Sequence, residues 1–238
     1  MVTQLNLGEI AVDVVFKDIK HVHLTVHPPA GRVRISAPRR MGLDPIRVFV
    51  ISKLDWIKKQ QTKLREQERE TPREYLDSES HYAWGKRYLL KIIECEEAPS
   101  IELKHDQMLL RLRPGANNKK AQAVVEEWYR EQIKEAVPPL ITKWESVMGV
   151  KVARFFVRQM KTRWGSCTPR RRSIRINTNL AKKPPELLEY IVVHEMAHLI
   201  VRHHNGRFTS IMDRLLPHWR LHRRELNSAP FGHETWRY

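Results

Sequence analysis

The stretch PPELLEYIVVHEMAHLIVRHHNGRF, residues 184–208, decides the fold around the candidate site of this chain. Residues 184–186, Pro-Pro-Glu, mark a helix start, and the apolar run after them predicts a helix that is largely buried. His194 and His198 are four residues apart, so they lie one turn apart on the same face of that helix. The next strong break in the helical pattern is Asn-Gly at 205–206, where we expect the chain to turn.

Two imidazoles on one helix face can bind a single tetrahedral metal ion, each at about 2.0–2.1 Å. Glu195 lies about 100° around the helix from His194, close enough to reach a water on that ion without binding the ion. In this H-E-x-x-H arrangement the ion lowers the pKa of the water toward about 7, and the carboxylate takes its proton. The spacing therefore predicts a catalytic metal site with Glu195 as general base, and such a base has no purpose in a purely structural site.

A third ligand is needed, and the sequence offers three candidates. His204 lies six residues after His198, the second-to-third spacing of H-E-x-x-H-x-x-G-x-x-H metalloproteases, although Val201 stands where that motif has its helix-breaking glycine. His203 would need a different exit from the helix, and Glu225 is a more distant carboxylate. Spacing favours His204 and leaves the other two as alternatives.

The charge of the chain points to anionic partners. Its formal net charge is +16 and its pI is near 10.1. Residues 151–183 hold a dense run of Lys and Arg with no Asp or Glu. Such an excess favours nucleic acid, nucleotides or acidic surfaces, and the alternative is a solvated basic surface without a specific partner.

Other features predict a cytoplasmic protein that does not enter a membrane. No apolar run approaches the roughly 20 residues that cross a bilayer, and the first residues lack the pattern of a secretory signal. Cys95 and Cys167 are too few to form a disulfide framework.

The pattern along the chain predicts an α+β fold. We expect an N-terminal β-rich region at 1–115, with a hairpin at 21–38 and a bridging helix at 44–70, followed by a helical catalytic domain at 116–238 with its own small sheet. Pro138-Pro139 should kink or interrupt the long helix that begins near 119, and Gly149 should end it. No internal repeat is evident.

Four blocks together resemble the YgjP-like metallopeptidase family, and more distantly the SprT-like and WLM-type zinc proteases. They are KTRWGSC (161–167), IRINTNL (174–180), YIVVHEMAHL (190–199) and HNGRF (204–208). The resemblance implies a zincin-like catalytic part that binds Zn²⁺. Carried over position by position, it makes His194, His198 and His204 the ligands and Glu195 the base, with Phe208 fixing the register of the third histidine.

Residues of the basic block are candidates for substrate binding. Lys161 and Arg163 are expected to line the cleft and stabilise negative charge. The strand predicted at 174–177, which ends at Asn177, would offer an edge for an extended peptide. His203 is left as a group that faces substrate or supports a ligand.

Three functions remain open at this point. The first is a metallopeptidase acting on a peptide or protein. The second, which the family resemblance also implies, is a nucleotide (UTP) pyrophosphatase, for which Mg²⁺ or Mn²⁺ would join at the phosphates. The third is a nucleic-acid-associated protease or binding module, favoured by the basic surface.

Overall fold

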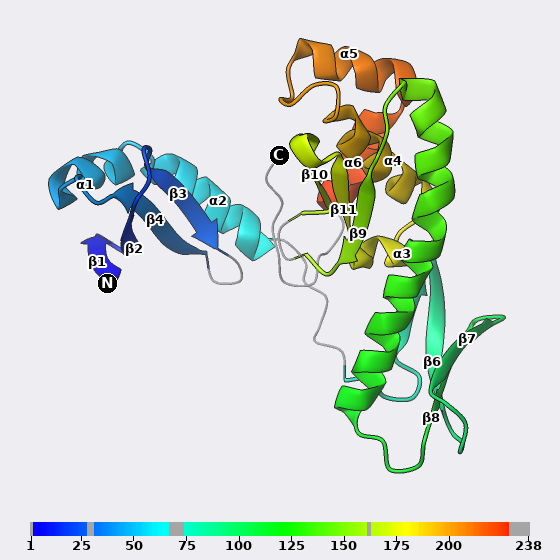
Figure 1. Ribbon diagram of the computed structural model, residues 1–238. Helices are drawn as coiled ribbons and strands as arrows, with labels where there is room; N and C mark the ends of the chain where they lie inside the picture. The colour runs from blue at the N-terminus through cyan, green and yellow to red at the C-terminus, as the bar shows by residue number, and fades with distance from the viewer. Residues whose placement is uncertain (1, 28–30, 67–73, 161–162, 229–238) are drawn as a thin grey trace. The chain divides into compact units, whose positions relative to one another are not determined.

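The chain folds into two compact units, each with its own strands and helices (Figure 1). The computed structural model describes residues 2–27, 31–66, 74–160 and 163–228. Unit 1 holds the described residues up to 66, and unit 2 holds those from 74 to 228. Both units combine helices with mixed sheets, so the predicted α+β class is confirmed. None of the described helices is long and apolar enough to span a bilayer.

Unit 1 is a four-stranded sheet covered by two helices. The strands lie in the order β1-β2-β4-β3, namely Val2–Leu7, Ile10–Lys17, Arg32–Pro38 and His23–His27. β3 and β4 pair antiparallel, which confirms the predicted hairpin, while β2 and β4 are parallel. Apolar residues of the sheet and the helices form one buried core: Val12, Val14, Val33, Ile35, Ile46, Val50 and Ile57.

Within the helix predicted at 44–70 the structure has two helices, α1 (Leu43–Ile51) and α2 (Leu54–Glu66), and residues 67–70 lie outside the described part of the chain. At the break, the Ser52 N–H donates to the carbonyl of Val48 and the Lys53 N–H donates to that of Val50. Two separate helices let apolar residues on each reach the same core, which one straight helix would not do. That the segment 44–70 bridges two parts of the protein stays a prediction.

Unit 2 begins with a second four-stranded sheet. Its order is β5-β6-β8-β7, namely Ser80–Ala83, Lys86–Glu94, Gln107–Leu112 and Ser100–Lys104. The predicted boundary at 115/116 would place this sheet with the N-terminal region, but the structure groups it with the helices that follow. The Trp84 N–H donates to the Ala181 carbonyl at 2.7 Å, and the Tyr129 hydroxyl donates to the Tyr82 carbonyl at 2.7 Å. These bonds tie the β5–β6 turn to the rest of unit 2.

The two four-stranded sheets have the same topology. In each, the strands lie in the order first-second-fourth-third, the central pair is parallel and both outer pairs are antiparallel. A helix follows each sheet in the chain. This structural repeat was not visible in the sequence, because strand order depends on backbone pairing and quite different side chains can fill the two cores.

Helix α3 (Asn118–Met148) spans 31 residues and is the longest described element. The Asn117 side chain caps its start by accepting from the Lys120 N–H, and Gly149, at φ 65°, ends it as predicted. The predicted interruption at Pro138 and Pro139 does not occur. Both prolines lie on the exposed face, so water can satisfy the carbonyls that lose an amide partner.

A three-stranded sheet supports the candidate site. It consists of β9 (Arg154–Arg158), β10 (Gly165–Thr168) and β11 (Ser173–Asn177), with short helices η1 (Pro169–Arg171) and η2 (Thr178–Lys182) beside them. β11 is central, parallel to β9 and antiparallel to β10. The prediction that strand 174–177 offers an open edge is therefore wrong, because β11 is paired on both sides. Its inner residues Ile174 and Ile176 are fully buried.

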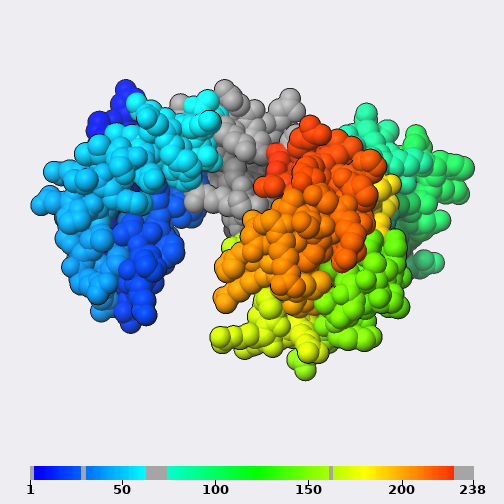
Figure 2. Space-filling model, turned by 90° about the horizontal axis from the view of Figure 1, so that it is seen from above, coloured from blue at the N-terminus to red at the C-terminus, as the bar shows by residue number. Residues whose placement is uncertain are grey.

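Three helices complete unit 2: α4 (Pro185–Ala197), α5 (Gly206–Leu215) and α6 (Trp219–Ser228). Both β10 and β11 pack against α4. In Figure 2 the orange and red segments α5 and α6 lie side by side on one face of this unit. Asp213 of α5 joins them, accepting from the Trp219 indole at 2.8 Å and from the Arg220 guanidinium.

Candidate metal centre

Helix α4 carries the H-E-x-x-H segment and ends earlier than the sequence indicated. Its last residue is Ala197, and His198 is the C-cap. The Val201 N–H donates back to the Ala197 carbonyl, and the buried Val201 side chain anchors the turn that follows. The chain therefore turns without a glycine. The predicted breaker Asn205 instead starts α5, where its side chain accepts from the Phe208 N–H at 3.1 Å.

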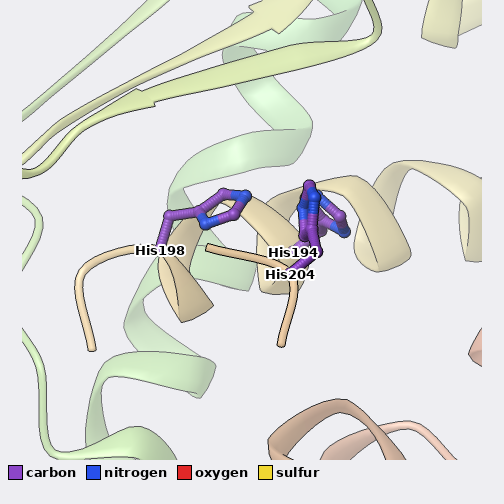
Figure 3. A group of neighbouring side chains, drawn as sticks. All are labelled: His194, His198 and His204. Atoms are coloured by element: carbon purple, nitrogen blue, oxygen red, sulfur yellow. The ribbon is translucent and has the colours of Figure 1, made fainter. Parts of the chain in front are cut away.

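Three imidazoles converge at this turn, two from α4 and its C-cap and one from the loop before α5 (Figure 3). His194 Nε2 and His204 Nε2 are 3.0 Å apart. One nitrogen from each of His194, His198 and His204 lies within 4.8 Å of the other two. Among the described residues this group has these three members, without His203 or Glu225.

Neighbouring groups fix how the rings are presented. His198 Nδ1 lies 3.1 Å from the Val201 carbonyl. A carbonyl only accepts, so Nδ1 carries the hydrogen and Nε2 keeps its lone pair for a ligand. The ring of Phe208 lies against all three imidazoles, with centroids 5.0, 5.0 and 4.6 Å from those of His194, His198 and His204. This apolar wall limits the orientations that the rings can take.

The imidazoles are held in the neutral form that binds metals. Burial, and then the neighbouring histidines and Arg223, lower the pKa of His194 to about 2. Burial likewise lowers the pKa values of His198 and His204. Three neutral nitrogen donors that converge on one point, with a defined tautomer at His198, fit a metal ion.

Glu195 is buried beside this cluster and rests against a glycine. Its exposed fraction is 2%. A Cβ on Gly165 of β10 would lie 2.6 Å from Glu195 Oε1 and 2.7 Å from its Cγ, so only glycine leaves room for the carboxylate. Burial raises the pKa of Glu195 to about 8, and the charge of Arg163 opposes part of that rise. Without a metal the carboxyl therefore holds its proton near neutral pH, and the positive charge of a bound ion would favour the carboxylate form that can accept one.

Cys167 lies two residues further along β10, on the same side as Gly165. Burial, and then the charge of Glu195, raise the pKa of its thiol to about 12. The thiolate is the nucleophilic form, so Cys167 is unsuited to nucleophilic catalysis.

Gly165→Ala is expected to lower turnover by about 10²-fold. A displacement of a catalytic group by roughly 1 Å can reduce the rate by that factor. The added methyl must push Glu195 from its position. Metal content should stay unchanged, since Gly165 is not in the donor group and the atoms nearest to the added methyl belong to Glu195. Steady-state kinetics with metal analysis checks this, and Ser166→Ala on the opposite face of β10 is the matched control. Full activity of Gly165→Ala would contradict the role of this contact.

The raised pKa of Glu195 has a consequence for stability in the metal-free protein. Folded Glu195 keeps its proton up to about pH 8, whereas unfolded Glu195 loses it near 4.5. Its stabilising contribution is full below 4.5 and is lost as the pH rises through 8. Glu195→Gln does not titrate, so after chelation it should gain stability relative to the wild type between pH 5 and 7.5, by up to about 1.4 kcal/mol per pH unit. Urea unfolding of both proteins at pH 5 and at pH 7.5 measures this. The same difference in free energy of unfolding between variant and wild type at the two pH values would contradict it.

The residues predicted to bind substrate differ in their exposure to solvent where the structure describes them. Lys161 lies outside the described residues. Arg163 and His203 are exposed. Asn177 is buried, and its amide donates to the carbonyls of Met160 at 2.9 Å and Arg163 at 2.8 Å. Both N–H groups are used, so Asn177 braces the chain that enters β10 and is not available to hold substrate as predicted.

The sequence did not point to a group of residues between α4 and α6. The Tyr190 ring lies one turn before His194, 5.8 Å from it, and stacks on Trp219 at 6.5 Å. Its buried hydroxyl has no hydrogen-bond partner among the described residues. Arg223 of α6 lies close enough to lower the pKa values of His194 and His204. The four-residue spacing of Tyr190 and His194 was a usable signal, but nothing in the sequence indicated that α6 packs here.

Three converging imidazoles beside a buried carboxylate are an arrangement that suits a metal-dependent hydrolase. The chain belongs to the YgjP-like metallopeptidase family, because the family model described as "YgjP-like, metallopeptidase domain" matches residues 20–229. This bears out the resemblance seen in the four sequence blocks.

Two solved structures are also similar to the chain. One is the zymogen of the metallopeptidase abylysin from Pyrococcus abyssi, at 18% identity and a TM-score of 0.36, over 38% of this chain and 90% of that one. The other is the zymogen of jannalysin from Methanocaldococcus jannaschii, at 19% identity and a TM-score of 0.33, over 40% and 92%. Comparison with curated proteins gave no match.

Proposed function

We propose that the protein is a zinc-dependent peptidase in which Glu195 activates the attacking water. The observation that carries this proposal is the position of the Glu195 carboxylate, buried against Gly165 and adjacent in sequence to a histidine of the cluster. A structural metal site does not need a buried base next to it. The cytoplasmic location predicted from the sequence stays a prediction.

His194, His198 and His204 would hold the zinc ion. Three neutral nitrogen donors leave a fourth tetrahedral position open, which is typical of catalytic zinc sites. When bound, zinc supplies a Lewis acid that polarises the scissile carbonyl and makes water more acidic. Phe208 keeps the rings in place on one side of the cluster.

Glu195 moves the proton in this proposal. Its carboxylate takes a proton from water as the water oxygen forms a bond to the carbonyl carbon. The same carboxyl then gives that proton to the departing amine nitrogen as the C–N bond breaks. The raised pKa suits both steps, because a group with a pKa near the working pH can accept and release a proton.

The edge of β10 is the place for an extended peptide. Among the described strands β10 pairs with β11 alone. The Asn177 N–H donates to the Trp164 carbonyl, which makes these two residues a hydrogen-bonded pair. Because such pairs alternate in an antiparallel ladder, the backbone groups of Gly165 and Cys167 point away from β11. A peptide pairing with them would lie beside Glu195.

A nucleotide pyrophosphatase is the second candidate. Two cations favour it. The charge of Arg163 lowers the pKa of Glu195, and the charge of Arg223 lowers the pKa values of His194 and His204. Phosphates bind well to such a pair of guanidinium groups. Mg²⁺ or Mn²⁺ would then be needed at the phosphates.

Arg163→Ala is expected to lower turnover about tenfold or more with metal retained, because the guanidinium lies near enough to the base to stabilise negative charge formed there. Arg163→Lys should keep part of the activity, since it keeps the charge. Turnover measured at saturating substrate separates this from weaker binding. Unchanged turnover in Arg163→Ala would remove the residue from the catalytic account.

Metal analysis and peptide digestion test the proposal together. The purified protein should contain about one zinc per chain. Hydrolysis of casein should stop after chelation and return when zinc is added, with mass spectrometry showing new peptide termini. A native protein that holds no metal, or one whose casein digestion survives chelation, would contradict the proposal.

A further inference from the structure

The outer face of the three-stranded sheet is unusually basic and carries an exposed aromatic ring. On β9 the side chains of Arg154, Phe156 and Arg158 alternate outward, while Phe155 and Val157 are half-buried on the inner face. Phe156 is 38% exposed, which is high for an aromatic side chain. An exposed aromatic ring between two arginines offers a face for stacking next to positive charge.

Arg175 of β11 completes the centre of this face. It lies opposite Phe156 in the register of the parallel pair, and its guanidinium carbon is 5.7 Å from the ring centroid. It also donates to the Thr168 hydroxyl at 3.2 Å. These contacts keep the guanidinium beside the ring and link it to β10.

More positive charge lies where β10 leads into β11. Arg170, Arg171 and Arg172 are exposed there. The segment 151–183 contains no Asp or Glu. Within the part of the chain that the structure describes, no ion pair neutralises Arg154, Arg158 or these three arginines. We call Arg154, Phe156, Arg158, Arg175 and Arg170–Arg172 the outer basic face.

We propose that the outer basic face binds single-stranded nucleic acid, with a base stacked on Phe156 and phosphates on the arginines. Aromatic rings among cations on an open sheet face suit unpaired bases, because every base has a face that can stack. A flat sheet face does not enter the major groove of a duplex, which admits a helix or a narrow ribbon. An acidic protein would match the charge but gives no reason for an exposed ring framed by arginines.

This face is separate from the metal centre. Gly165 and Cys167 of β10 point toward Glu195, whereas Ser166 and Thr168 point to the opposite side with Arg175. The proposal therefore does not depend on which bond the enzyme breaks, and Glu195→Gln should bind nucleic acid as the wild type does.

Fluorescence anisotropy with a labelled oligothymidylate of about 20 nucleotides, longer than a typical single-domain site, measures the interaction in the whole protein. Affinity should fall with salt, each phosphate contact adding about −0.7 to the logarithmic slope. The double variant Arg154→Gln/Arg158→Gln should make that slope about 1.4 less steep. Phe156→Ala should weaken binding roughly 5- to 100-fold, as expected for the loss of one stacked base. Phe156→Trp, which keeps an aromatic ring, should bind as the wild type does.

Matched variants in and beside the other sheet of unit 2 serve as controls. Tyr82→Ala removes another exposed aromatic ring, and Lys104→Gln/Arg113→Gln removes two other exposed cations. Neither should change the affinity beyond about twofold, apart from the modest effect of net charge. Circular dichroism shows whether each variant is folded.

Several outcomes would overturn the proposal. These are no binding at low salt, a duplex of equal length bound more tightly than the single strand, polyglutamate competing as well as the oligonucleotide, or Phe156→Ala behaving like Tyr82→Ala. If Phe156→Ala does not fold, Phe156→Leu tests the same point, since it keeps apolar volume but cannot stack.

Discussion

Glu195→Gln is expected to lower the kcat for peptide hydrolysis by about 10²- to 10⁴-fold, the usual contribution of a general base, while the protein keeps its metal. The amide has nearly the same shape as the carboxylate, so it should still fit against Gly165. It cannot accept the proton of the attacking water. Kinetics on a quenched-fluorescence peptide, with zinc content measured on the same sample, gives both quantities.

Glu186→Gln is the matched control for this variant. Glu186 lies in the first turn of the same helix and is exposed, so its loss should leave turnover within about twofold of the wild type. Two results would count against the role of Glu195. One is near-normal kcat in Glu195→Gln, and the other is loss of zinc in that variant, which would make Glu195 part of the donor set.

His204→Gln is expected to lower metal affinity by at least about 10³-fold, more than the 10- to 100-fold typical of residues that only support a ligand. Its Nε2 lies 3.0 Å from that of His194, whereas its neighbour His203 is outside the donor group. His203→Gln should therefore retain zinc. Competition with a chromophoric chelator measures both affinities under the same conditions.

These two variants differ by one position in the chain, so general effects on folding or charge are closely matched. Retention of zinc by His204→Gln together with its loss from His203→Gln would reverse the assignment. Loss of zinc from both would show that the loop conformation, and not one ring, determines binding.

The central part of the site could be predicted from spacing alone. His194, Glu195 and His198 stand at fixed angles on any helix, and the apolar run before them indicated that the helix is buried. The third histidine was predicted as His204 by spacing and resemblance, and the structure brings it to the other two. The route of the chain between them was not predicted, because it turns at the buried Val201, before the Asn-Gly pair at 205–206 where the turn was expected.

Other parts of the site depend on contacts between distant segments, which local patterns do not reveal. Gly165 makes room for a carboxylate thirty positions later in the chain. Asn177 braces Met160 and Arg163, although its strand was expected to hold a peptide along an open edge. Arg223 reaches the cluster because α6 packs on α4.

For the fold, the class was predictable and the grouping was not. Alternation and helical periodicity indicated α+β, as observed. The sheet formed by β5–β8 joined unit 2 because backbone bonds such as Trp84 to Ala181 link it there. Pro138 and Pro139 remained inside α3 because they lie on its exposed face, a property of register that composition does not show.

A parallel assay of the wild type and Glu195→Gln on casein and on UTP, each with zinc, Mg²⁺ or Mn²⁺, tests the central claim most directly. The proposed peptidase predicts that the zinc-loaded wild type cleaves casein, that Glu195→Gln does not, and that UTP stays intact in both. Hydrolysis of UTP by the wild type without any cleavage of casein, lost in Glu195→Gln, would contradict the peptidase and make the protein a nucleotide pyrophosphatase.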